Sequence, residues 1–93
     1  MESAQWTSIN YLNLKNNKIG DLVGPVMQTW ANMEKLYLGS NLLRRLPTEI
    51  GLLQNAVEFD FSSNFLESIP SSLALCTNLE LLHLGIVTIL HLV

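Results

Sequence analysis

Apolar and polar residues alternate in several short stretches of the chain. In residues 35–39, for example, the apolar Leu36 and Leu38 lie on either side of Tyr37. This alternation is typical of a strand that buries one face, because successive side chains of a strand point to opposite sides. The pattern predicts four short strands, at residues 11–15, 35–39, 58–62 and 81–85.

The strand pattern belongs to a longer unit that occurs four times. Aligning the chain on Asn17, Asn41 and Asn64 gives spacings of 24 and 23 residues, and another 23 residues reaches Val87, where the asparagine is missing. Each unit has the form L-x-x-L-x-L-x-x-N-x-L. The apolar positions are Ile9, Leu12, Leu14 and Ile19; Met33, Leu36, Leu38 and Leu43; Ala56, Phe59, Phe61 and Leu66; and Leu79, Leu82, Leu84 and Ile89. Every one of these positions is apolar, which indicates internal repeats.

A second apolar set follows each turn, on the side of the unit opposite the strand. The sets are Leu46, Ile50 and Leu53 in the second unit, and Ile69, Leu73 and Cys76 in the third. Pro47 and Pro70 occupy equivalent places one residue after Leu46 and Ile69. Proline suits a loop that enters an irregular or one-turn helical segment, because it donates no backbone hydrogen bond. Thr48 and Ser71 follow the prolines, and we expect them to cap these turns.

Both tryptophans and the single cysteine occupy one repeated position. Trp6 and Trp30 precede the first apolar position of a unit by three residues, as Leu53 and Cys76 do later. We therefore expect these side chains to lie in the core. Cys76 is interpreted as a small buried hydrophobe, not as a nucleophile or a metal ligand. The first unit departs from the others because it is one residue longer and lacks the Leu-Pro pair.

The asparagines that end the strands, Asn17, Asn41 and Asn64, are interpreted as structural. An amide side chain carries two donor hydrogens and an acceptor oxygen. Inside a loop, it can satisfy backbone groups of its own turn and of the next coil. We expect these side chains to form a ladder along the stack, in which a missing rung is costly.

These repeats resemble the leucine-rich repeat family over nearly the whole chain. The segments at residues 46–51 and 69–73 are similar to the L-P-x-x-I/L part of its 23-residue repeats, which is common in intracellular signalling members. The resemblance implies an α/β solenoid, a short right-handed coil with parallel strands on the concave face and loops and short 3-10 or helical turns on the convex face. We expect one domain over residues 1–93, with repeats at about 9–32, 33–55, 56–78 and 79–93, the last incomplete. Protein recognition is the role that the resemblance implies.

The strand side chains that alternate with the buried ones should form the concave surface. In the expected stack Lys35 lies opposite Glu58, and Asp60 lies between Tyr37 and His83. Tyrosine is common among the residues that dominate binding energy, so we place Tyr37 and Asp60 at the centre of any site. The candidate protein-binding residues are Tyr11, Asn13, Lys35, Tyr37, Glu58, Asp60 and His83.

The chemistry of this surface does not favour catalysis. Asp60 and His83, with Ser62 and Ser63 near, have the residue types of a hydrolase triad. A flat strand surface lacks the oxyanion site and the water exclusion that such a triad needs. We expect a cross-strand polar pair between Asp60 and His83 instead. His83 and His91 are too isolated to form a metal site, and no cofactor is expected.

Composition narrows the partners and the compartment. The chain carries five Lys and Arg against eight Asp and Glu, a formal charge of -3, and no basic patch, which makes nucleic acid an unsuitable partner. No signal peptide precedes residue 8, and no apolar run approaches the ~20 residues that cross a bilayer. Cys76 has no second cysteine with which to form an internal disulfide. We therefore expect a cytoplasmic, non-membrane protein.

The leading functional hypothesis is a non-enzymatic protein-interaction scaffold, an adaptor or regulator in intracellular signal transduction. The alternative is a fragment of a larger receptor, kinase or GTPase with this kind of repeat, whose catalytic part is absent. Four rungs give a concave patch of roughly 300 Å², against the about 800 Å² per partner of a stable interface. The uncharged segment at residues 85–93 and the uncapped ends leave self-association open.

Overall fold

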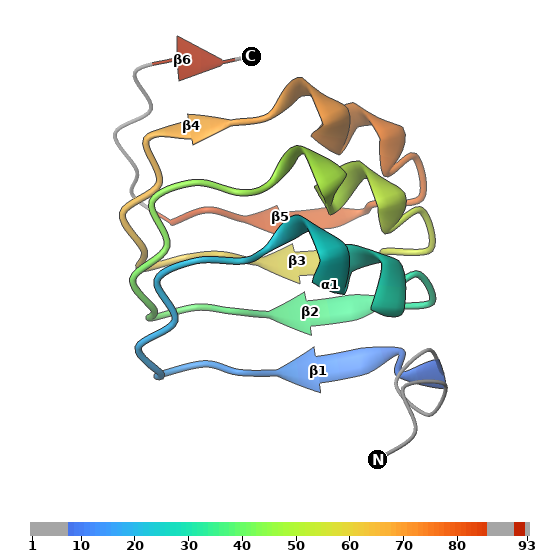
Figure 1. Ribbon diagram of the computed structural model, residues 1–93, viewed down its shortest axis with the longest axis horizontal. Helices are drawn as coiled ribbons and strands as arrows, with labels where there is room; N and C mark the ends of the chain where they lie inside the picture. Colours follow the sequence, from blue (N-terminus) through green and yellow to red (C-terminus); the bar gives the residue numbers. More distant parts are fainter. Residues whose placement is uncertain (1–7, 86–90, 93) are drawn as a thin grey trace.

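The computed structural model describes residues 8–85 and the backbone of residues 91–92. Four parallel strands form one sheet in the order β1-β2-β3-β5, and they stack in chain order in Figure 1. Each strand is three residues long, shorter than the five expected from alternation. The strands are β1 (Tyr11–Asn13), β2 (Lys35–Tyr37), β3 (Glu58–Asp60) and β5 (Leu81–His83).

The strands pair in the register that the repeat predicts. Leu36 of β2 pairs with Leu12 on one side and with Phe59 on the other, and Phe59 pairs with Leu82. This places one apolar column on the inner face of the sheet. Two further predictions are confirmed, since Lys35 pairs with Glu58 and Asp60 lies between Tyr37 and His83.

Short helical segments cover the inner side of the sheet, as Figure 1 shows. They are the α-helix α1 (Gly24–Thr29) and the 3-10 helices η2 (Thr48–Leu52) and η3 (Ser71–Leu75). The expectation that Thr48 and Ser71 cap these turns is wrong. Pro47 and Pro70 are the N-cap residues, with ψ of 151° and 142°, and neither cap makes a side-chain hydrogen bond. The extended proline already sets the entry angle, so Thr48 and Ser71 become the first helical residues.

The first repeat uses its extra residue to form the α-helix. Pro25 lies in the first turn of α1, where a missing backbone N–H costs no intrahelical hydrogen bond. Met27, on the inner side of α1, is fully buried. Val23 is the N-cap of α1, as Pro47 is of η2, so Leu22-Val23 replaces the Leu-Pro entry of the later repeats without opening the core.

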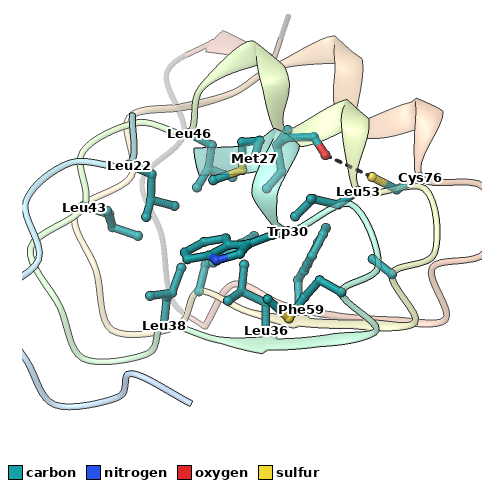
Figure 2. Packing of buried hydrophobic residues seen from close by; sticks show 14 of the residues in the cluster. Leu22, Met27, Trp30, Leu36, Leu38, Leu43, Leu46, Leu53, Phe59 and Cys76 are labelled. Carbon is teal, nitrogen blue, oxygen red and sulfur yellow. Dashed lines mark hydrogen bonds between the residues drawn. The ribbon is translucent and has the colours of Figure 1, made fainter. Parts of the chain in front are cut away.

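The core lies between the sheet and the helical segments. Figure 2 shows the Trp30 indole in the middle of this cluster, beside Leu36 and Leu38 from β2 and the residue after it. Trp30, Leu53 and Cys76 are all buried, which confirms the interpretation of their shared position as core. Trp6, the fourth member of that set, lies outside the described residues.

The core is complete only in the middle of the stack. Leu36 and Phe59 are fully buried, whereas Leu82, at the equivalent position on the edge strand β5, is 37% exposed. Leu12, at the other edge, is partly buried. Each rung covers its neighbours, so a rung at an edge is covered on one side only.

A second, smaller sheet lies at the far end of the stack from β1. It pairs β4 (Ser68–Ile69) with β6 (His91–Leu92) in parallel (Figure 1). The predictions for Val87 and Ile89 fall outside the described residues. In the part of the chain that the structure describes, no helix has the length and apolar character needed to cross a membrane.

Candidate functional site

Asn41 shows how the turn asparagines join the coils. This residue is 3% exposed, and its Nδ2 donates within its own turn to the carbonyl oxygens of Leu38 and Gly39, at 2.9 and 3.2 Å. The same Nδ2 lies 3.0 Å from the Leu14 carbonyl oxygen, and its Oδ1 accepts from the Ile19 N–H at 3.1 Å. Both of these partners belong to the preceding coil. One side chain therefore satisfies backbone groups of two coils.

Asn64 repeats this arrangement one coil later. Its Nδ2 donates to the Leu38 carbonyl at 2.9 Å, and its Oδ1 accepts from the Leu43 N–H at 2.9 Å. Asn17, in the first coil, is exposed, and among the described residues its side chain bonds only to carbonyls of its own turn. The expectation that each amide bonds to the next coil is wrong, because the bonds run to the preceding coil. The preceding coil supplies both kinds of partner: Nδ2 meets the carbonyl just after its strand (Leu14 or Leu38), and Oδ1 meets an N–H of its turn (Ile19 or Leu43).

A chain of three side chains crosses the concave face from β2 to β5. The Tyr37 hydroxyl donates to Glu58 Oε1 at 2.8 Å, and His83 Nε2 lies 3.0 Å from Glu58 Oε2. Both contacts are diagonal, since Glu58 pairs in register with Lys35 and Leu81. Glu58 thus holds Tyr37 and His83 in fixed positions on either side of β3.

Asp60 does not form the expected pair with His83, and the histidine contacts Glu58 instead. Asp60 Oδ1 accepts from the backbone N–H and the hydroxyl of Ser62, at 2.9 and 2.6 Å. Its Oδ2 lies 3.5 Å from Lys15 Nζ. The short aspartate side chain is therefore occupied by its own turn and by Lys15, whereas the longer glutamate reaches the histidine.

An aromatic pair adjoins these charged groups. The Tyr11 and Tyr37 rings meet edge to face, with centroids 5.4 Å apart, and Lys15 Nζ lies 5.6 Å from the Tyr37 ring centroid. Edge-to-face packing and a cation over an aromatic ring are both attractive. Tyr11 remains 54% exposed. The pair is an open aromatic surface bordered by charge.

The two remaining candidates border this group. Asn13 is exposed, and its Oδ1 accepts from the Lys15 N–H at 3.0 Å, which fixes the chain after β1. Lys35 is exposed beside Glu58. The structure thus brings together five of the predicted residues. Tyr11, Tyr37, Glu58 and His83 contact one another in sequence, and Lys15 joins Asp60 to Tyr37. Lys15 and Ser62 were missing from the prediction, although both lie in the next column of the alternating pattern.

Hydrogen bonds and nearby charges shift the pKa values of Tyr37, Glu58 and Asp60. The bond to Glu58 raises the pKa of Tyr37 to about 12, with partial burial adding to the effect. The bond from Tyr37 also lowers the pKa of Glu58, against the opposing effect of desolvation, and His83 and Lys35 lower it further. Burial alone raises the pKa of Asp60, but the bonds from Ser62 and the charge of Lys15 outweigh it and lower the pKa overall. Both carboxylates are therefore charged at neutral pH.

Replacing Glu58 with alanine should make Tyr37 easier to ionise. The neutral tyrosine is the form that Glu58 stabilises, so this contribution is present below the ordinary pKa of about 10 and is lost as the pH rises through about 12. Tyrosinate absorbance at 295 nm, in a Tyr11→Phe background, would report Tyr37 alone. The midpoint should fall from about 12 towards about 10 in the variant. An unchanged midpoint, or an equal fall in Glu67→Ala, would show that the hydrogen bond is not the cause.

A second set of asparagines, absent from the predicted site, lines the edge of the sheet where the strands begin. Asn55 Nδ2 donates to the Ala31 carbonyl at 3.2 Å, and Asn78 Nδ2 donates to the Gln54 carbonyl at 3.0 Å. Both bonds again run to the preceding coil. The 23-residue spacing of Asn32, Asn55 and Asn78 is the sequence signal that could have shown this column.

The arrangement on the concave face supports recognition better than reaction chemistry. The residues do not form a hydrolase triad. The Ser62 hydroxyl bonds to Asp60, and His83 contacts Glu58 instead of either of them. Within residues 8–85 no group of three or more histidine, cysteine or acidic residues is placed to hold a metal ion.

The single cysteine lies in the core, away from the concave face. Burial raises the pKa of the Cys76 thiol, whose Sγ lies 3.4 Å from the Ile50 carbonyl oxygen (Figure 2).

Comparison with solved structures decides the family. A leucine-rich repeat protein of Leptospira interrogans superposes with a TM-score of 0.88 over 97% of this chain, at 31% sequence identity. The chain belongs to the leucine-rich repeat proteins. The human Leucine-rich repeat-containing protein 20 is 36% identical over 47 residues, half of this chain. The Dictyostelium discoideum protein named "Probable serine/threonine-protein kinase pats1" is 33% identical over 66 residues.

These three similar proteins are much longer than the chain. It spans 26% of the human protein, 2% of the Dictyostelium protein and 23% of the Leptospira chain. No protein-family model matches the chain. The similarity therefore identifies a leucine-rich repeat stack with parallel strands and short 3-10 turns.

Proposed function

We propose that the concave face of this leucine-rich repeat stack binds another protein, and that the chain serves as an adaptor or regulator in cytoplasmic signal transduction. The observation that carries the proposal is the linked cluster of Tyr11, Tyr37, Glu58 and His83. Its aromatic rings are held in place by contacts within the chain and remain open to a partner. Prearranged side chains lose little conformational freedom on binding.

The proposed anchor of the interface is Tyr37. This ring is half-buried against Tyr11 and Lys15, and its hydroxyl is fixed by Glu58. Aromatic residues at the centre of an interface carry much of its binding energy. The chain has a single cysteine, which is buried and has no second cysteine with which to form a disulfide. This supports the proposed cytoplasmic location, where thiols stay reduced.

A second candidate function is that of a recognition segment within a larger signalling enzyme. The similarity to the Dictyostelium protein over 66 residues, only 2% of its length, favours this alternative. In that case catalysis would be supplied by other parts of the protein, and the same concave cluster would hold a substrate or a regulator. The proposal about the face is common to both functions.

A site-specific crosslinking experiment tests which face binds. A photoreactive phenylalanine would replace Tyr11 on the concave face, or the exposed Leu75 on the convex face, in separate variants expressed in cells. We expect a discrete crosslinked protein from position 11 and none of the same mass from position 75. Capture of the same protein equally from both positions would contradict the proposal.

The protein captured at position 11 then allows a direct affinity measurement. We expect Tyr37→Ala to weaken its binding at least about tenfold, because truncating a central aromatic anchor removes both contact area and shape. Phe65→Ala is the matched control, since Phe65 is 62% exposed on a loop away from the concave cluster. Calorimetry on purified proteins would measure both variants. Unchanged affinity in Tyr37→Ala would place the interface elsewhere.

A further inference from the structure

A groove runs along the edge of the sheet at which the strands begin. Its volume is about 690 Å³, and it crosses all four coils. Glu34, Val57 and Glu80 occupy equivalent places in three successive coils, each directly before a strand. This surface shares no residue with the concave cluster proposed above to bind a protein.

The backbone positions directly before the strands are already bonded from coil to coil. The Val57 N–H donates to the Glu34 carbonyl at 2.7 Å, and the Glu80 N–H donates to the Val57 carbonyl at 2.9 Å. A ligand therefore cannot join here by adding a strand. Recognition has to use the side chains that line the groove.

Those side chains offer hydrogen-bond acceptors and negative charge, but no positive charge. Asn55 and Asn78 each use one Nδ2 hydrogen to hold the preceding coil, which orients the amide and leaves its Oδ1 as an acceptor beside one further N–H donor. Glu34 and Glu80 are exposed and add two carboxylates. Val57 lies between them and is half-buried, so it forms an apolar floor. None of the described residues that line the groove is basic.

The spacing of the two carboxylates selects a ligand. Glu34 and Glu80 are two rungs apart, which corresponds to about 10 Å along the stack. An extended polyproline-type segment rises about 3.1 Å per residue and returns to the same face every three residues, or every 9.3 Å or so. Basic side chains at positions i and i+3 of such a segment would therefore meet both carboxylates.

We propose that this groove is a second interaction surface, which binds an extended, arginine- or lysine-bearing segment of a partner protein. The two carboxylates pair with the basic side chains, and the amide oxygens of Asn55 and Asn78 accept from the segment's donors. The segment's apolar residues contact Val57. The groove lies where the strands begin and shares no residue with the concave cluster, so this partner can bind at the same time as one on the concave face.

Labelled peptides provide the test. A fluorescent proline-rich peptide with arginines at i and i+3 would be titrated with the 93-residue protein at physiological salt and followed by anisotropy. A peptide with glutamates in place of both arginines is the ligand control. We expect the arginine peptide to bind at least about fivefold more tightly, and Glu34→Gln/Glu80→Gln to remove most of this difference.

Two further variants make the outcome specific. Glu67→Gln removes an exposed carboxylate that pairs with Arg44 at 3.0 Å on another part of the surface, and it should change the affinity less than twofold. Tyr37→Ala, which tests the concave face, should also leave peptide binding unchanged. Equal affinity for both peptides would overturn the proposal. So would equal weakening in Glu67→Gln, which indicates net charge alone, or weakening confined to Tyr37→Ala, which places the peptide on the concave face.

Discussion

Replacing Asn41 with alanine should lower the free energy of unfolding by about 3 kcal/mol, since each buried group left without a partner costs about 1–3 kcal/mol. The substitution leaves the Ile19 N–H without its acceptor and removes donors from the Leu14 and Leu38 carbonyls. It also breaks side-chain bonds between the first two coils. Urea unfolding followed by circular dichroism would measure the change. A loss of 3 kcal/mol is large against the usual total of about 5–15 kcal/mol.

Asn17→Ala is the matched control for this prediction. Asn17 occupies the same place in the first coil, but it is exposed, and within the part of the chain that the structure describes it bonds only to the Leu14 and Lys15 carbonyls of its own turn. Water can replace those bonds, so we expect a loss of less than about 1 kcal/mol. Similar losses in the two variants would mean that the bonds to the preceding coil add little.

Phe59→Ala should destabilise the protein by about 4 kcal/mol, because removal of a buried aromatic ring leaves a cavity as well as losing buried area. Phe59 is fully buried between Leu36 and Leu82 in the inner column of the sheet, and its ring lies 5.2 Å from that of Phe61. Thermal or urea unfolding would measure the loss. The neighbouring rungs are fixed by backbone pairing, so the core cannot close fully around the gap.

Phe65→Ala removes the same side chain from the surface. Phe65 is 62% exposed on the loop after Asn64, and we expect a change within about 0.5 kcal/mol. Because both variants delete the same side chain, the difference between their unfolding free energies measures the effect of burial. A loss of several kcal/mol in Phe65→Ala would show that this loop contributes to the core more than its exposure indicates.

The arrangement of the coils was predictable from the sequence, because periodicity fixes register. Once Leu12, Leu36, Phe59 and Leu82 are placed one repeat apart, parallel pairing must align them, and the structure does so. A slip of one residue would turn every apolar side chain outward. The burial of Trp30 follows from the same argument, since its column is filled by apolar residues in later repeats.

Side-chain contacts on the concave face were less predictable. Register places His83 beside Asp60, yet the histidine contacts Glu58, one column away. The choice depends on side-chain length and on competition, since Ser62 already occupies Asp60. The repeat pattern contains no information on such competition. The direction of the asparagine bonds and the capping role of Pro47 and Pro70 likewise depend on local backbone angles that spacing does not define.

The polarity of the asparagine bonds makes the stack modular in one direction. In Asn41, Asn64, Asn55 and Asn78, the connecting side chain always belongs to the later coil and the bonded backbone to the earlier one. A 23-residue segment copied in register would therefore bring its own connectors and would need only ordinary backbone groups from the coil before it. Such a stack can be lengthened by tandem duplication without a compensating change upstream.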